Sequence, residues 1–274
     1  MKLLFLATRD VPSYLANDVR AYHGNVVQVS EPRGMILLEH YSCNFFPIPV
    51  GVQKLGKPVH KPIKVSDITV VTVHYWPSDV LERCLLSYLP EEVEFIKLDN
   101  EGNKRWTSGA KALNYGIKKA KNDIVICAHE DLVFKEVWFE SFIKQECRLK
   151  NWGVLGIVGM GFERRMHWGS NYDVPYKVAT LDECCYIINR KNGIWFDEKT
   201  FKGWHCYGVD FCLQAYDRGL SVYVVSGPAT HGQRGYAHSD KWLSALKPAQ
   251  KLLKKKWEKI FPSIPTTTGV LRKY

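Results

Sequence analysis

Residues 67–90 read DITVVTVHYWPSDVLERCLLSYLP, and two different periodicities follow one another in this stretch. The run from Ile68 to Val73 is apolar or β-branched throughout, which is typical of a strand buried on both faces. Asp79, with Glu82 three residues later, then predicts a capped helix start. Leucines at positions 81, 85 and 89 continue as a helical stripe, so the stretch predicts a strand followed by a helix.

The same alternation continues along the chain. Further strands are expected at residues 93–98, 124–128, 154–158 and 220–225, and helices over residues 108–120, 135–149 and 207–215. Strands that alternate with helices indicate βαβ units with right-handed crossovers. We therefore expect an α/β fold with a Rossmann-like, mostly parallel sheet and helices on both faces.

Three segments are expected from the change of pattern along the chain. Residues 1–66 form a small N-terminal appendage with strand-like pieces at 3–7, 26–29 and 35–41, and they end in a Pro- and Lys-rich connector at 57–62. Residues 67–240 form the main domain. Residues 241–274 form a basic amphipathic helix and a tail.

The composition excludes several classes of protein. Of 274 residues, 46% are hydrophobic and 24% charged, which argues against a disordered or collagen-like chain. No apolar run approaches the roughly 18 residues that cross a bilayer, and residues 3–7 are too short for the core of a signal peptide, so a cytoplasmic protein is expected. Eight cysteines without a CxxC pair indicate reduced, buried thiols. The net charge of +10 favours a polyanionic partner: a phosphate-bearing ligand, nucleic acid or an anionic membrane.

Polar residues follow two of the predicted strands. Ligands of open parallel sheets bind outside the carboxyl ends of the strands, where Asp99-Asn100 and His129-Glu130-Asp131 stand. His129 and Asp131 are two residues apart, so both can point toward the crevice while Glu130 points away, and a histidine with a carboxylate suits a divalent cation. The alternatives are a plain turn for the first pair and a helix cap or solvated acid for the second group.

Three further residues have both a functional and a structural interpretation. Asn114 lies near the buried face of its helix, where its amide needs a partner from either the acidic loop or a neighbouring carbonyl. Asp210 stands near the start of an apolar helix, where Asp is commonly a cap. His231 follows the strand at 220–225 and is either a ligand or an ordinary loop histidine.

In their order along the chain these pieces resemble family 2 glycosyltransferases with a GT-A fold, particularly bacterial members with a His-x-Asp metal motif. The resemblance covers about residues 67–235 and is carried by Asp99-Asn100, residues 109–117, residues 123–131, residues 207–215 and His231. It implies transfer of a sugar from a nucleoside-diphosphate sugar, with UDP favoured, to an acceptor hydroxyl on a glycan or glycolipid, as in polysaccharide biosynthesis. Mn²⁺ or Mg²⁺ is the implied cofactor.

The resemblance also assigns roles to single residues. It implies nucleotide binding by Asp99, Asn100, Asn114 and His129, metal binding by Asp131 and His231, acceptor binding by Asp182, Trp204 and His205, and a general base at Asp210. Gly208 stands where many relatives have another acid, which leaves Asp210 as the candidate base in that motif. A single base opposite the leaving group predicts one displacement with inversion at the anomeric carbon. Burial of Trp204 in the core is equally expected.

Two alternatives concern the basic surface of the chain. A non-catalytic module that binds glycan or nucleic acid through charge and aromatic stacking would also explain the composition, although no nucleic-acid motif is present and no nucleic-acid partner is expected. Residues 247–261 place Leu253, Trp257 and Ile260 on one helical face among lysines. This face is expected either to contact the inner face of the membrane, which suits a lipid-linked acceptor, or to pack on its own domain.

Overall fold

The computed structural model describes residues 56–76, 79–171, 174–231 and 240–272, together with three short strands nearer the N-terminus. These strands are β1 (Lys2–Phe5), β2 (Val26–Gln28) and β3 (Phe45–Pro47), which pair antiparallel in the order β2-β1-β3. The first two lie where strands were predicted. The predicted strand at 35–41 lies outside the described residues.

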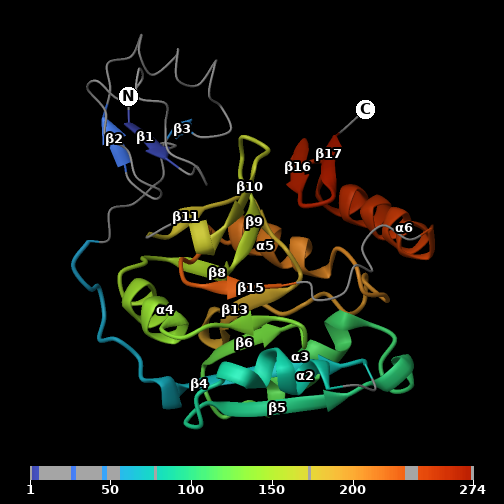
Figure 1. Cartoon of the computed structure of the whole chain (residues 1–274). Coiled ribbons are helices and arrows are strands. Elements are labelled where there is room, and N and C mark those ends of the chain that lie inside the picture. Colours follow the sequence, from blue (N-terminus) through green and yellow to red (C-terminus); the bar gives the residue numbers. More distant parts are fainter. Residues whose placement is uncertain are drawn as a thin grey trace.

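Seven strands form the central sheet, in the order β11-β14-β8-β13-β6-β4-β5 (Figure 1). They are β4 (Ile68–His74), β5 (Glu94–Asp99), β6 (Ile124–Ala128), β8 (Trp152–Gly156), β11 (Tyr176–Lys177), β13 (Cys185–Asn189) and β14 (Ser221–Val224). β13 runs antiparallel to both of its neighbours and β11 runs antiparallel to β14, whereas the other five strands share one direction. The predicted α/β fold with a mostly parallel sheet is confirmed.

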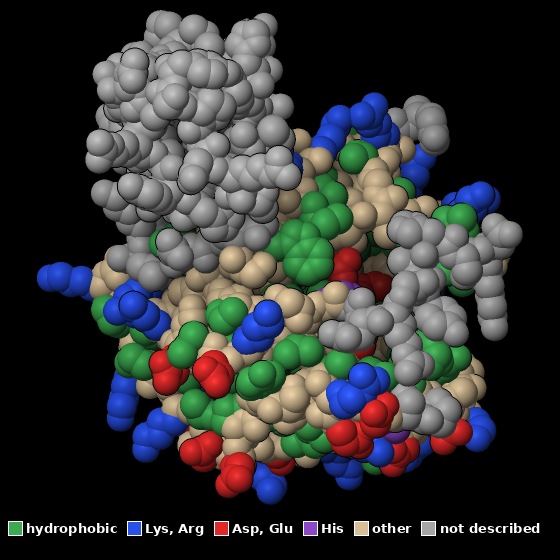
Figure 2. Space-filling view, viewed as in Figure 1, with side chains coloured by type: hydrophobic (Ala, Val, Ile, Leu, Met, Phe, Trp, Pro, Cys, Tyr) green, Lys and Arg blue, Asp and Glu red, His purple; other side chains and the backbone are tan. Residues whose placement is uncertain are grey.

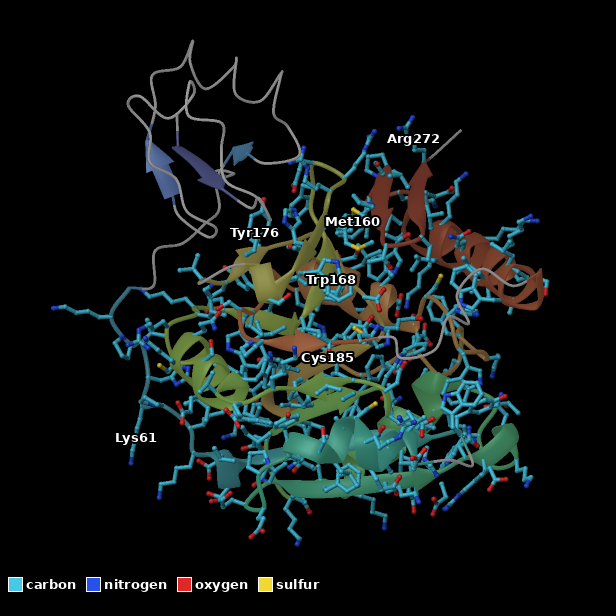
Figure 3. All side chains as sticks on the ribbon, viewed as in Figure 1. Lys61, Met160, Trp168, Tyr176, Cys185 and Arg272 are labelled. Carbon is cyan, nitrogen blue, oxygen red and sulfur yellow. The ribbon has the colours of Figure 1, made fainter. Side chains whose placement is uncertain are left out.

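The strand predicted at 154–158 is divided between two sheets. β8 belongs to the central sheet, whereas β9 (Val158–Met160) pairs with β10 (Met166–Trp168) and β12 (Thr180–Leu181) in a separate three-stranded sheet. Figure 3 shows Met160 and Trp168 above Cys185, the first residue of β13, which lies near the centre of the molecule. Both β8 and β9 are buried and apolar, so the apolar run does not mark the break between them.

Helices cover both faces of the central sheet (Figure 1). α3 (Gly109–Lys119) and α5 (Tyr207–Asp217) share one core with Val71 and Val125 of the strands. α2 (Val80–Arg83) and α4 (Trp138–Glu146) contribute to the core on the other face. The remaining elements are the 3₁₀ helices η1 (Val65–Asp67), η2 (Leu85–Tyr88), η3 (Glu101–Asn103), η4 (Gly169–Asn171) and η5 (Arg190–Asn192), the strands β7 (Val133–Phe134), β15 (Ala229–Thr230), β16 (Ser263–Thr266) and β17 (Gly269–Arg272), and α6 (Asp240–Trp257).

The helix starts follow the predicted signals only in part. α3 begins at Ser108, whose hydroxyl oxygen accepts a hydrogen bond from the Lys111 N–H at 3.3 Å, as expected for an N-cap. Asp79 does not cap α2; its carboxylate pairs with Arg83 at 2.7 Å instead, and the helix continues as the tighter η2. α4 is shorter than predicted because Val137, with φ of 61°, is left-handed and precedes its first turn.

The C-terminal helix packs on its own domain. Leu253 and Trp257 of α6 are 0% and 5% exposed and belong to the same core as α3 and α5, as does Ile264 of β16. Only Ile260 of the predicted face is exposed. α6 and β16 therefore pack on the main domain, and the packed alternative describes this helix. None of the described helices has the length and apolar character needed to cross a bilayer.

The predicted state of the cysteines is confirmed for the described residues. The seven cysteines among them are free and buried, and Cys43 lies outside this part of the chain. Burial raises the pKa of the thiols at Cys127, Cys185 and Cys206 well above the ordinary range. These thiols therefore stay protonated near neutral pH and contribute to packing.

One ion pair of α6 gives a pH-dependent contribution to stability. Lys256 Nζ lies 2.8 Å from Asp197 Oδ2. Burial alone would raise the pKa of Asp197, but the hydrogen bonds from Lys256 and from the Thr200 N–H lower it far below the ordinary value. This lowered pKa stabilises the folded state above about pH 4, where an unfolded Asp is ionised, and the contribution is lost as the pH falls further.

We therefore expect Asp197→Asn to lower the free energy of unfolding by about 2 kcal/mol near pH 6, since it removes hydrogen bonds to a charged group. The difference from the wild type should shrink between about pH 4 and pH 2. Urea titrations near pH 6 and near pH 2 measure this difference in the free energy of unfolding. The exposed Asp217, replaced by Asn, is the control. An Asp197→Asn deficit that stays constant over this range would contradict the assignment.

Candidate functional site

Three side chains with metal-binding atoms meet beyond the carboxyl end of β6. One ligand atom each from His129, Asp131 and His231 lies within 4.8 Å of the other two. His129 Nδ1 is 3.2 Å from His231 Nε2, which is itself 3.4 Å from Asp131 Oδ1. We call these three residues the histidine-aspartate cluster. The predicted metal ligands Asp131 and His231 are thus brought together, with His129 beside them.

Strand pairing explains how residues so far apart in sequence meet. His129 and Asp131 directly follow β6, and the chain then forms β7. β7 pairs antiparallel with β15, with Val133 opposite Thr230, so His231 emerges next to Asp131. Figure 2 shows acidic side chains and a histidine in a recess of the front face.

Asp131 and His231 each stabilise the charged form of the other. Burial alone would raise the pKa of Asp131, but the hydrogen bond and positive charge of His231 lower it below its ordinary value. Burial alone would lower the pKa of His231, and the Asp131 carboxylate raises it instead. Burial and the neighbouring His231 lower the pKa of His129, so this imidazole is neutral near pH 7 and carries a ring-nitrogen lone pair.

This set of donors fits a divalent cation. Two imidazoles and one carboxylate are ligands that manganese and related ions accept, and three protein ligands leave positions for phosphate oxygens. A second group, Asp182, Cys184 and His231, is equally close together but fits less well. Burial raises the pKa of the Cys184 thiol, and the two Asp182 oxygens already accept hydrogen bonds from the Cys184 N–H at 3.1 Å and the Thr267 hydroxyl at 2.8 Å.

Glu130 points away from the cluster, as the alternation of the strand predicts. Its buried carboxylate accepts hydrogen bonds from the N–H groups of Tyr75 and Trp76, both at 3.0 Å, and lies 2.6 Å from His74 Nδ1. Glu130 therefore fixes the segment that follows β4 at the same edge of the sheet.

The predicted nucleotide-binding pair at the end of β5 has two different environments. Asp99 is open to solvent, with a side chain that is 72% exposed and an oxygen 3.1 Å from Lys97 Nζ. Asn100 is fully buried, and its amide bonds to Asn103 and to both backbone groups of Trp106. The turn alternative therefore describes Asn100, because its side-chain amide is hydrogen-bonded to the loop that follows β5.

Asn114 does not reach the cluster. Its Nδ2 donates to the Phe196 carbonyl at 2.8 Å and its Oδ1 accepts from the Phe196 N–H at 3.1 Å. The neighbouring-carbonyl alternative is confirmed, and nucleotide binding by Asn114 stays a prediction. The amide fixes the segment around residue 196 against α3.

Asp210, the predicted general base, is enclosed by α5 and α6. Its side chain is 0% exposed, and it accepts hydrogen bonds from Trp257 Nε1 at 2.7 Å and Gln214 Nε2 at 2.8 Å. Lys256 Nζ also lies 2.8 Å from Oδ1. In this structure the Asp210 carboxylate is thus occupied by its neighbours, and its role as general base stays a prediction.

The three predicted acceptor residues lie in different surroundings. Trp204 is partly buried and packs against the core beside α3, which agrees with the burial alternative. His205 lies edge-on to Trp242, with ring centroids 5.4 Å apart. Asp182 lies beside the cluster, since its carboxylate is grouped with His231.

The sequence interpretation missed Glu183, whose Oε1 accepts a hydrogen bond from the Gly208 N–H at 3.3 Å, in the first turn of α5. Glu183 belongs to a pair of acids directly before the apolar run of β13. An acid directly before a buried strand is a position at which a functional side chain could have been expected.

A cavity of about 610 Å³ lies at the opposite end of the strands, where the parallel strands begin. Its lining includes Asp67, Asp123 and Trp152, which stand at or just before the starts of β4, β6 and β8. Parallel sheets bind ligands at the carboxyl edge, and the histidine-aspartate cluster lies there. We therefore take the cluster as the candidate site.

No family model matches the chain. A curated relative from Fuscovulum blasticum, described as ATP synthase subunits region ORF 6, is 26% identical in an alignment of 170 residues that covers 55% of this chain and 67% of the relative.

Three solved structures are similar in fold. GalNAc-T7 with UDP, GalNAc and Mn²⁺ has a TM-score of 0.48 and 12% identity over 67% of this chain and 47% of its own. TarS from S. aureus has a TM-score of 0.38 and 14% identity over 58% of this chain and 60% of its own. The mannosyltransferase PcManGT from Pyrobaculum calidifontis, in complex with GDP-Man and Mn²⁺, has a TM-score of 0.43 and 14% identity over 74% of this chain and 64% of its own.

This chain thus spans about half to two thirds of the length of these structures. All three TM-scores are below 0.5.

Proposed function

We propose that the chain is a metal-dependent, inverting glycosyltransferase that uses a nucleoside-diphosphate sugar, with UDP as the expected nucleotide. The acceptor is a hydroxyl group on a glycan or glycolipid. The observation that carries this proposal is the meeting of His129, Asp131 and His231 at the carboxyl edge of a mostly parallel sheet. The order of the motifs along the chain, which resembles that of the GT-A type, gives the cluster its chemical context.

The cluster residues would hold the cofactor, Mn²⁺ or Mg²⁺. A divalent cation bound there would neutralise the negative charge that grows on the departing diphosphate. Asp131 supplies the carboxylate for this cation and, through its negative charge, also orients His231. The neutral imidazole of His129 can offer its lone pair.

Two further groups at this edge fit the donor. Asp99 is exposed at the end of β5, and beside its ion pair with Lys97 its carboxylate can accept hydrogen bonds from the base of the nucleotide. Glu130 holds the segment after β4, at Tyr75 and Trp76, in a fixed position beside Asp99, since β4 and β5 are paired there. We expect this segment and Asp99 to form the wall that receives the base.

A thermal-shift panel of UDP, GDP and CDP, each with and without Mn²⁺, tests the proposal. A ligand that binds only the folded state raises its stability, by about 2.7 kcal/mol at 100 times Kd. We expect the melting temperature to rise for one nucleotide and only when the metal is present. No response to any nucleotide, combined with strongly salt-dependent binding of single-stranded nucleic acid, would support the non-catalytic binding module instead.

A further inference from the structure

The start of α5 cannot carry an acidic side chain of its own at residue 208. A Cβ on Gly208 would overlap the hydroxyl oxygen of Tyr186. Tyr186 is fully buried, donates a hydrogen bond to the Leu181 carbonyl at 3.4 Å and packs edge-on against Phe196. Because a packed interior gives a buried ring little room to move, any side chain at residue 208 would displace it.

Glu183 brings a carboxylate to the start of α5 from a different segment. The N–H of Gly208 donates to its Oε1, and the unpaired N–H groups of a helix start favour a negative charge there. The position of Glu183 is fixed by the sheet, because β13 pairs with β6 and the next residue, Cys184, accepts a hydrogen bond from the His129 N–H at 2.9 Å. Glu183 is therefore attached to the strand end that carries the cluster.

Asp182 connects Glu183 with the cluster electrostatically. The negative charge of Asp182 acts on the pKa of His129, of His231 and of Glu183. Glu183 is partly exposed, whereas Asp210 is fully enclosed. Of the two acids at the start of α5, Glu183 is the one that an acceptor can approach.

We propose that Glu183 is the general base of the transfer reaction, an inference that rests on the proposed function. The acceptor hydroxyl oxygen forms a bond with the anomeric carbon of the donor sugar. The bond between that carbon and the diphosphate oxygen breaks, and its electron pair leaves with the nucleoside diphosphate. The proton of the hydroxyl passes to the Glu183 carboxylate.

The surroundings of Glu183 suit this role. Burial raises the pKa of Glu183 to about 8, against the opposing effect of the Gly208 N–H and with a further increase from Asp182. Burial raises the pKa of the Tyr186 and Tyr207 hydroxyls and of the Cys206 thiol, and the negative charge of Glu183 adds to each increase. A base is most effective when its pKa lies near the operating pH, and the ionised form of Glu183, which takes the proton, increases as the pH rises toward about 8.

The test combines two variants with two measurements. Glu183→Gln keeps an oxygen that can accept from Gly208, so it should fold and keep the metal-dependent nucleotide shift, but kcat should fall by about 100-fold to 10,000-fold because a general base contributes that much. In Glu183→Ala, added azide should restore release of the nucleoside diphosphate and form a glycosyl azide, because azide attacks without losing a proton. The exposed Glu136, replaced by Gln, is the matched control.

The outcomes separate the two proposals. A Glu183→Gln enzyme that transfers sugar within about threefold of the wild-type rate would overturn the base assignment and leave the proposed function standing. The same holds if Glu183→Ala loses transfer and azide recovers none of it. A wild-type protein that transfers from no donor would overturn the proposed function and the base assignment with it.

Discussion

Asp131→Asn is expected to reduce sugar transfer by about 1,000-fold, which corresponds to about 4 kcal/mol of transition-state stabilisation. Asn keeps the size of the side chain but removes the charge that attracts a divalent cation. It also removes the negative partner of His231, which lies 3.4 Å away. Both losses weaken the same site, so metal binding and transfer should fall together.

The measurements are direct titration with Mn²⁺ and the nucleotide thermal shift, followed by transfer kinetics. Glu136→Gln is again the control, since it removes an exposed carboxylate from the segment that follows β7 without touching the cluster. An Asp131→Asn variant that binds Mn²⁺ and nucleotide like the wild type would show that the cluster is not the metal site.

The fold could be predicted where strands are buried on both faces. The runs at β4, β5 and β6 are long enough to be recognised, and the helix between β5 and β6 has a regular apolar face and a Ser108 cap. β13 was missed, although it is also buried. Its place between β6 and β8 depends on pairing with strands more than thirty residues earlier in the chain, and local periodicity contains no information about such pairing.

The site was predictable to the extent that it depends on strand ends. His129 and Asp131 follow a recognisable strand, so their position at the carboxyl edge could be expected. The environment of Asp210 could not, because the residues that enclose it come from α6, over forty positions later. Glu183 was overlooked for a similar reason: its hydrogen-bond partner, Gly208, lies 25 residues further on.

Lys256→Met is expected to lower the free energy of unfolding by about 3 kcal/mol near pH 7, the low end of the range for breaking a buried ion pair, because Lys256 is partly exposed. Met keeps much of the packing of the lysine stem but leaves Asp210 as a buried carboxylate without its cation. Lys256 also pairs with Asp197, so two carboxylates lose the same partner. The exposed Lys255, replaced by Met, is the control.

The pH dependence of this deficit identifies its cause. Burial raises the pKa of Asp210, against the hydrogen bonds from Lys256 and Trp257, and loss of Lys256 should raise that pKa further. A carboxylate with a raised folded pKa destabilises the fold as the pH rises through that value, so the deficit of Lys256→Met should be small at about pH 4 and grow toward about pH 7. Adding Asp210→Asn to Lys256→Met should recover part of the lost stability at pH 7, because the buried charge is then absent. A double variant that is as unstable as the sum of the two single variants would mean that Lys256 stabilises α6 independently of Asp210.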